Sequence, residues 1–319
     1  FRDVRLVGAP PASIGKFGGD TDNWMWPRHT GDFALLRIYM APDGSPAEYS
    51  VDNIPYVPKH HLPVQLDGVE NKDYTMIMGY PGRTNRYLTS FGIKEALQIT
   101  YPEIIKIRTK KIDIIKNEMA NDATIELQYA AKVFNVSNYW KKLIGQSKAL
   151  KKMKVYDEKL KIENEFRAWV ESNENNKIKY GNVLESLKES YERNKKIALN
   201  RTYLTETIFQ GSEILSFSYT MKNRINSIAK NGEERTEDIR KLKKIAKEFY
   251  KNYNAKVDQK VLAAMLEMYY YNVPKAQHAS VFKKIENQLF GIKKLDFNYY
   301  SKSIFNKSYF SNQEKCLNF

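Results

Sequence analysis

Cysteine is almost absent from this chain of 319 residues, since Cys316 is the only one and cannot close an intramolecular disulfide. No Cys/His cluster has the spacing of a zinc site, so neither disulfides nor structural zinc are expected to hold the fold. Long apolar runs are also lacking, and no stretch approaches the roughly 18 residues that a membrane span needs. Hydrophobic residues still make up 42% of the chain and aromatic residues 13%, which excludes a wholly disordered protein.

Proline and glycine are scarce over most of the chain, because 9 of 11 prolines and 9 of 15 glycines fall within residues 1–90. Charge divides at the same point. Residues 1–90 carry 9 basic and 10 acidic side chains, whereas residues 91–319 carry 43 basic and 27 acidic ones. The length predicts about two domains, so we expect one domain over residues 1–90 and another over residues 91–319.

The first ninety residues have the pattern of β structure. Residues 33–40 and 74–78 are apolar runs of strand length that end in Pro/Gly turns. Residues 54–58 and 62–66 contain too many prolines for central strands and suit an extended connector. No stretch of helical period interrupts the region, which favours a small antiparallel barrel or sandwich.

From about residue 93 the hydrophobic pattern becomes helical. Thr100 and Glu103 have the spacing of a capping box, as do Asn182 and Glu185. A third helix is predicted to start at Asp258 and to end at Val273, with an apolar face made of Val261, Leu262, Met265, Leu266 and Tyr269. The fold class is therefore α+β, with a β region followed by a long helical domain.

The segment richest in chemistry is GKFGGDTDNWMWPRHTGD at residues 15–32. Glycines cost backbone entropy and polar groups need partners when buried, so such a loop packs poorly and is more often functional than structural. Asp32 stands at the start of the predicted strand 33–40. Taken alone, it is better explained as an aspartate that caps a turn and happens to precede a strand.

Longer segments carry a family resemblance. The strand that follows Asp32 resembles the one that bears the triad aspartate in chymotrypsin-type serine proteases. Residues 3–7 and 10–33, GYPGRTNRY at 79–87 and SNYWK at 137–141 are similar to the bacterial dipeptidyl-peptidase VII and XI type of serine exopeptidase. That family inserts a helical domain into the second barrel of a chymotrypsin-like double β-barrel. The resemblance covers most of residues 1–150 and is looser beyond.

The resemblance assigns roles residue by residue. Asp32 matches the triad aspartate, which orients the catalytic histidine. Asn23, Trp24 and Asn138 match positions that bind the free α-amino group of the substrate. Amide oxygens can accept from an ammonium, and an indole face attracts it. Without the resemblance, Asn138 is a helix residue facing solvent and Trp24 a core anchor.

The resemblance also implies a triad histidine and a nucleophilic serine, and no residue of this sequence matches either. His29 lies too close to Asp32 to be the triad histidine and is interpreted as a loop residue, and no serine has a Gly-x-Ser-Gly setting. We expect the chain to be an internal piece, with the histidine and serine outside it. No metal or cofactor is implied. The implied substrate is an oligopeptide with a free N-terminus, and a homodimer in the periplasm or at the cell surface is expected.

Two other functions remain open at this level. The basic excess of residues 91–319 suits a nucleic-acid-binding helical module, but those residues are scattered among acids and form no known nucleic-acid motif. A peptide-binding or scaffold protein that keeps the protease fold without its chemistry is the other alternative. A histidine and a Gly-Asn-Ser-Gly-like segment in the flanking sequence would favour the peptidase.

Overall fold

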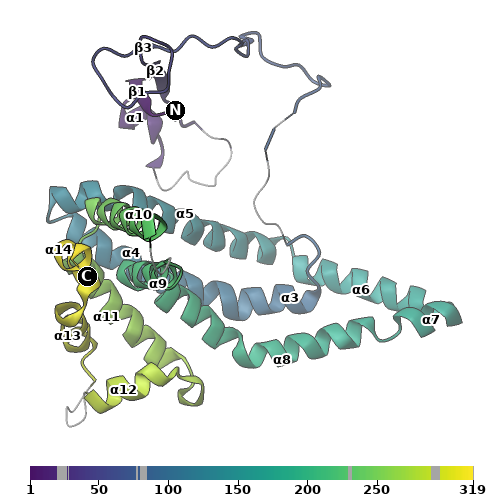
Figure 1. The fold of residues 1–319 in the computed structure, drawn as a ribbon. Coiled ribbons are helices and arrows are strands. Elements are labelled where there is room, and N and C mark those ends of the chain that lie inside the picture. The colour runs from purple at the N-terminus through teal and green to yellow at the C-terminus, as the bar shows by residue number, and fades with distance from the viewer. Residues whose placement is uncertain are drawn as a thin grey trace. The chain divides into compact units, whose positions relative to one another are not determined.

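The computed structural model describes residues 1–19, 27, 29–76, 78–79, 85–228, 232–288 and 295–318 (Figure 1). The chain divides into two compact units, Phe1–Asn85 and Arg86–Phe319. The first holds a small antiparallel sheet and the second is built of helices. The described fold is thus mostly helical with a small sheet, as the predicted α+β class requires.

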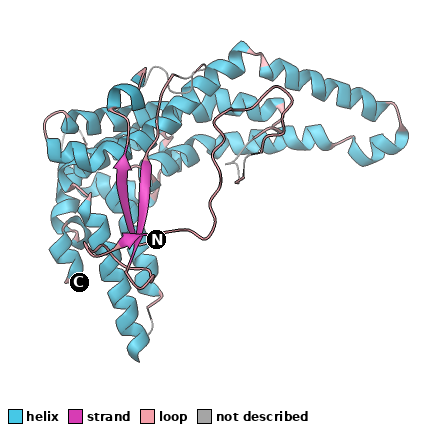
Figure 2. Ribbon diagram, turned by 90° about the horizontal axis from the view of Figure 1, so that it is seen from above, coloured by secondary structure: helices cyan, strands magenta, loops and turns pink. Residues whose placement is uncertain are grey.

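Unit 1 is organised by a three-stranded sheet in the order β1-β2-β3. Strands β1 (Asp3–Gly8) and β2 (Leu35–Met40) run antiparallel, and β3 (Ile54–Pro55) pairs with the end of β2 (Figure 2). The one-turn helix α1 (Ala12–Gly15) lies between β1 and β2 in the chain. Pro55 can join the sheet because β3 is an edge strand, where a missing N–H costs little.

Two sequence predictions for unit 1 are wrong in detail. The strand expected over residues 33–40 begins only at Leu35. The strand expected over residues 74–78 is not formed by its described members, 74–76 and 78, and Ile77 lies outside the described residues. An apolar run of strand length becomes a strand only when another strand pairs with it, and the described part of unit 1 offers none to this segment.

A buried polar cluster ties the sheet together. Asp3 is 2% exposed and receives hydrogen bonds from Arg5 Nη2 at 2.7 Å and Asn53 Nδ2 at 2.8 Å. Arg5 also donates to the Ser50 carbonyl and stacks over the ring of Tyr39. The Arg5 guanidinium holds the pKa of Asp3 below its usual value. Ion pair and amide together therefore join the start of β1 to the 50–53 loop.

The helices of unit 2 follow one another with short connections. In chain order they are α3 (Ser90–Glu95), α4 (Tyr101–Met119), α5 (Ala123–Lys152), α6 (Val155–Glu171), α7 (Glu174–Tyr180), α8 (Val183–Tyr203), α9 (Glu213–Asn226), α10 (Gly232–Lys251), α11 (Ala255–Asn272), α12 (Ser280–Gln288), α13 (Phe297–Lys307) and α14 (Gln313–Leu317). Two π-helices, η1 (Ala96–Thr100) and η2 (Leu204–Phe209), continue α3 and α8, and two short 3₁₀ turns are η3 (Lys275–Gln277) and η4 (Tyr309–Ser311).

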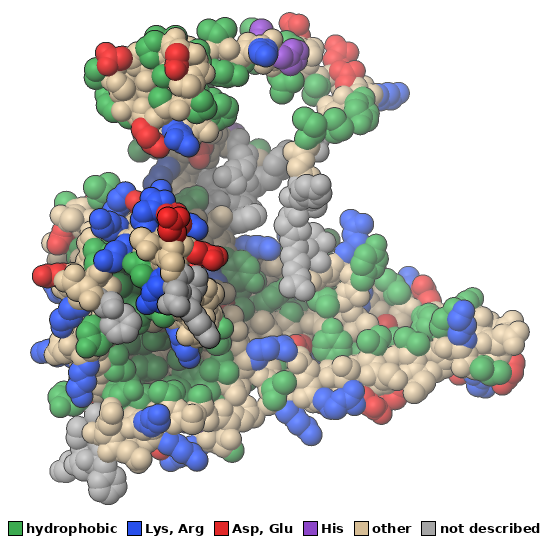
Figure 3. All heavy atoms as spheres, viewed as in Figure 1, with side chains coloured by type: hydrophobic (Ala, Val, Ile, Leu, Met, Phe, Trp, Pro, Cys, Tyr) green, Lys and Arg blue, Asp and Glu red, His purple; other side chains and the backbone are tan. Residues whose placement is uncertain are grey.

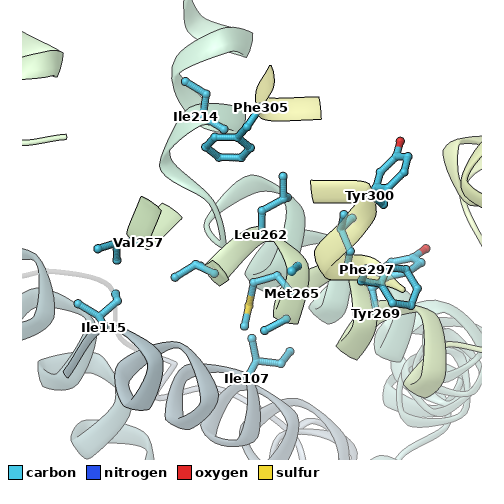
Figure 4. Close-up of a cluster of buried hydrophobic side chains, with 14 of the residues drawn as sticks. Ile107, Ile115, Ile214, Val257, Leu262, Met265, Tyr269, Phe297, Tyr300 and Phe305 are labelled. Carbon is cyan, nitrogen blue, oxygen red and sulfur yellow. The ribbon is translucent and has the colours of Figure 1, made fainter. Parts of the chain in front are cut away.

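The core of unit 2 is centred on α11, which packs against α4 and α13. All five apolar residues predicted for its inner face are buried, with Met265 and Tyr269 fully enclosed. Ile107 and Ile115 of α4 and Phe297 of α13 meet them (Figure 4). Because α11 is buried along most of its circumference, helices pack against it on several sides, and it forms the centre of the core.

Of the three predicted helix starts, two keep their position without the predicted side-chain cap and one is displaced. Thr100 already has helical φ and ψ and lies at the end of η1, so among the described residues its hydroxyl caps no helix. Helix α8 does begin after Asn182, without a described side-chain cap. Helix α11 begins at Ala255 with Asn254 as its cap, three residues earlier than Asp258 predicted, and ends before Val273 as expected.

Candidate active site

Asp32 lies between two anchored segments of unit 1. On one side the Gly31 N–H donates to the Ile14 carbonyl at 3.1 Å, and Thr30 Oγ1 donates to the Phe17 carbonyl at 3.2 Å. On the other side β2 starts at Leu35. A Cβ at position 31 would lie 3.0 Å from Ile14 Cγ2, so glycine permits this close approach. The base of the 15–31 loop is thus closed, and the exposed Asp32 follows it directly.

The rest of the predicted loop site is only partly described. Asn23 and Trp24 lie outside the described residues. His29 is exposed and irregular in backbone, in agreement with its interpretation as a loop residue. The contacts of Asn23 and Trp24 with a substrate amine therefore stay predictions.

Asn138 lies in the middle of α5 and is half-buried. Ser137 beside it is 7% exposed, and Tyr139 on its other side is 39% exposed. The Asn138 side chain is therefore carried on a rigid helix at the boundary between core and surface, a position from which an amide can reach a ligand. A helix supports such a group more accurately than a loop does.

The turn of α5 that carries Asn138, residues 136–140, is attached by polar contacts to α4, which is joined in turn to η2. Arg108 of α4 donates from Nε and Nη2 to the Glu206 carboxylate at 2.8 and 3.1 Å, and its guanidinium stacks 4.6 Å from the Tyr139 ring centre. Trp140 Nε1 donates to Thr109 Oγ1 at 2.8 Å. Sequence reasoning did not find Arg108 or Glu206, because they are 98 residues apart in the chain.

Next to this turn lies a cavity of about 510 Å³. Its polar lining joins both π-helices to α4, α5 and α8 through Thr100, Arg108, Tyr139, Arg201, Thr205 and Glu206. π-Helical turns often mark functional sites, because the extra residue redirects side chains. This cavity and the Asn138 turn form the most polar concave region that we find beside a predicted site residue.

A second polar cluster lies deeper in unit 2. Asp258 is 2% exposed, and burial, together with nearby Glu213, raises its pKa to about 6. Burial lowers the pKa of Lys111, which donates to the Gln210 carbonyl at 2.7 Å. Lys132 forms an ion pair with Glu213 at 2.6 Å. Since each of these groups has a partner within the fold, we assign the cluster a structural role.

Two properties of the described residues bear on chemistry. No group of three or more His, Cys, Asp or Glu side chains among them is arranged to hold a metal ion. None of the described helices combines the length and apolarity needed to cross a bilayer. Among the predicted site residues, the structure therefore offers one carboxylate at Asp32 in unit 1 and one amide at Asn138 in unit 2.

Comparison with known protein families assigns the chain to a class of peptidases. The peptidase S46 family model matches residues 1–319, and the chain belongs to that family. The match spans both the loop that carries Asp32 and the helical unit that carries Asn138. The resemblance recognised from the sequence is thereby confirmed.

Individual relatives are dipeptidyl-peptidases. The chain is 43% identical over 276 residues to the Asp/Glu-specific dipeptidyl-peptidase of Flavobacterium psychrophilum, a match covering 86% of this chain and 39% of that protein. It is 39% identical to dipeptidyl-peptidase 7 of Porphyromonas gingivalis, covering 97% and 42%. The structure of Porphyromonas endodontalis DPP11 with the dipeptide Arg-Glu aligns over the whole chain and 45% of its own, at 32% identity and a TM-score of 0.74. The chain thus spans less than half the length of these relatives.

Proposed function

We propose that the chain belongs to a serine dipeptidyl-peptidase that releases dipeptides from the free N-terminus of oligopeptides. The observation that carries this proposal is the match of the peptidase S46 family model to residues 1–319, together with similar proteins that are named as dipeptidyl-peptidases. Relatives of both the Asp/Glu-specific and the type 7 class are similar to this chain, so no preference for the residue before the scissile bond is proposed.

Asp32 is proposed as the triad aspartate. It would accept the Nδ1–H of a histidine and stabilise the imidazolium that forms when the serine hydroxyl is deprotonated, without taking the proton itself. The histidine and the serine are proposed to come from parts of the whole protein other than these residues. The closed base of the 15–31 loop supports this role, because a residue that orients a base must itself be held in place.

The sheet of unit 1 is proposed to be part of a chymotrypsin-like barrel, with unit 2 as the inserted helical domain. Leu6 of β1 and Leu36 of β2 are more than 60% exposed. Figure 3 shows hydrophobic side chains on the surface of unit 1. A strand pair with such exposure is expected in a barrel whose other strands come from elsewhere in the protein.

Asn23, Trp24 and Asn138 are proposed to bind the substrate's ammonium group. Dipeptide release requires the enzyme to measure two residues from the N-terminus, and a fixed ammonium site does this. The structure with Arg-Glu shows that the relative DPP11 binds a dipeptide, which is the product that such a reaction releases. A homodimer in the periplasm or at the cell surface is proposed from the family resemblance.

The test is the substitution Asp32→Asn in an enzyme that contains this chain together with its serine and histidine. We expect kcat for a free-amine dipeptidyl substrate to fall about ten-thousandfold with the fold intact, because Asn would hold the wrong histidine tautomer. Matched N-acetylated peptides should be poor substrates of the unsubstituted enzyme. A folded Asp32→Asn enzyme with less than a tenfold loss, or rapid cleavage of acetylated peptides, would contradict the proposal.

A further inference from the structure

Tyr139 and Trp140 follow the proposed amine contact Asn138 directly in the chain, yet the proposed function gives them no task. Both contact residues of α4. Tyr139 receives the Arg108 guanidinium over its ring, and Trp140 donates its indole N–H to Thr109, whose hydroxyl in turn donates to the Ile105 carbonyl at 2.7 Å. Two consecutive residues of α4 therefore hold two consecutive residues of α5, immediately after Asn138.

Arg108 is the centre of these contacts. Its side chain is 13% exposed and that of Glu206 7%. Nη2 also donates to Gln210 Oε1 at 3.0 Å, and Nη1 lies 3.5 Å from the Val136 carbonyl, at the other end of the turn. A bidentate pair fixes the plane of a guanidinium, so Glu206 and Gln210 determine where Arg108 meets α5. Arg108 thus touches the Asn138 turn at both ends.

Close packing alone does not fix the α5 turn on the side of Tyr139, because a cavity lies there. Arg108, Glu206 and Tyr139 line the cavity of about 510 Å³, so the Tyr139 ring meets open space where a core residue would meet neighbouring atoms. The contacts of Arg108 with Tyr139 and of Thr109 with Trp140 therefore fix the turn on this side.

We propose that Arg108, held by Glu206, is a positioning residue that fixes the α5 turn so that Asn138 meets the substrate ammonium; this rests on the proposed function. A rigid α5 turn presents the Asn138 amide in one orientation, and loss of that orientation lowers the rate with substrates that carry an ammonium. Arg108 acts through Asn138 and has no contact of its own with substrate in this mechanism.

The test compares kcat/KM on matched free-amine and N-acetylated peptides. Removing one partner of a buried ion pair leaves a charge without its partner, so Arg108→Met is combined with Glu206→Gln. We expect about a tenfold loss on free-amine peptides and little change on acetylated ones. Arg108→Lys, which keeps the charge without the fork, should lose less than the Arg108→Met/Glu206→Gln pair.

Arg240→Met is the matched control for these variants, and Trp140→Phe tests the α5 turn independently of Arg108. Arg240 forms a similar bidentate pair with Glu237, at 2.7 and 2.8 Å, on the exposed face of α10, so Arg240→Met should leave both substrates unaffected. Trp140→Phe keeps a ring and removes the bond to Thr109. It should reproduce the free-amine loss in weaker form even where the Arg108 variants fail to fold.

The decisive comparison uses Asn138→Ala. If Arg108 acts through Asn138, the Arg108→Met/Glu206→Gln pair costs nothing further once Asn138 is alanine. Losses that multiply in the combined variant, or equal losses on both substrates, overturn the positioning role while leaving the amine contact standing. Absence of any free-amine-specific loss in Asn138→Ala itself overturns the amine contact and the positioning role with it.

Discussion

The carboxylate of Asp258 accepts four hydrogen bonds in the interior of unit 2. Ser212 Oγ donates at 3.0 Å, the backbone N–H groups of Glu213 and Ile214 at 2.9 and 2.8 Å, and Tyr253 at 3.3 Å. Two of these donors are the first N–H groups of α9, which have no partner within their own helix. Asp258, although part of α11, therefore serves as the cap of α9 and joins two helices through one side chain.

Asp258 should make the stability of unit 2 depend on pH. Its pKa in the folded state is about 6, against 3.8 for the unstructured side chain, so between these values the folded protein binds one more proton than the unfolded one. The free energy of unfolding should then fall by about 3 kcal/mol from this group as the pH rises from 4 to above 6. Urea unfolding across that range should show the slope, and Asp258→Asn should remove it.

Asp122 provides the control for this experiment. It caps α5 by accepting from the N–H of Thr124 at 2.8 Å, but at an exposed site. Asp122→Asn should lower stability modestly while leaving the slope due to Asp258 in place. Equal slopes in the unsubstituted protein and in Asp258→Asn would show that this carboxyl is ionised throughout the range.

The sequence predicted only part of the role of Asp258, namely that it lies near the start of a helix. An acidic residue before an apolar helical face is typical of a helix start, and the face itself was predicted correctly. What Asp258 caps depends on α9, more than forty residues away, and a local pattern carries no information on that pairing. Asn138 was predicted as an amine contact from resemblance alone for the same reason, whereas Arg108 had no local signal at all.

At the scale of elements, the two π-helices explain where helix prediction failed and why the site is polar. η1 carries the chain from α3 into α4 without a break, so the Thr100 capping pattern lies inside continuous helix. η2 brings Glu206 to Arg108, and Gly211 follows where the chain leaves η2 for α9. A single inserted residue shifts the helical phase, which periodicity over a short window cannot detect.

Gly211→Ala should destabilise unit 2. An added Cβ would lie 1.9 Å from the Thr207 carbonyl oxygen and 3.0 Å from Met265 Cγ, so backbone must move at the end of η2. We expect a loss of about 2–4 kcal/mol in the free energy of unfolding, measured by chemical denaturation.

Gly145 of α5 is the matched control for Gly211. A Cβ there meets none of the described atoms within 4 Å, and the position lies within a regular helix. Gly145→Ala should therefore stabilise the protein by about 0.5–1 kcal/mol. If the two substitutions change the free energy of unfolding equally, the close contact between position 211 and the Thr207 carbonyl does not exist in solution.

At the scale of the whole molecule, the two units differ in how they are stabilised. The buried apolar side chains of the described residues all belong to unit 2, from Ile93 to Phe305. Unit 1 depends on main-chain pairing and on the Asp3–Arg5–Asn53 cluster. Composition changes near residue 90, where proline, glycine and charge all shift. It could not indicate that the sheet of unit 1 would leave its leucines uncovered.

Those uncovered leucines have a consequence for behaviour in solution. Leu6 and Leu36 are cross-strand partners, 66% and 62% exposed, and such a surface should adsorb environment-sensitive dyes and make the 319-residue chain self-associate. Replacing both with threonine, which keeps strand preference, should reduce anilinonaphthalene fluorescence and light scattering. Leu127→Thr, at an exposed site on α5 outside the sheet, should not. Within the barrel proposed for the whole protein the same leucines would be interior, so that protein should show little fluorescence with the dye.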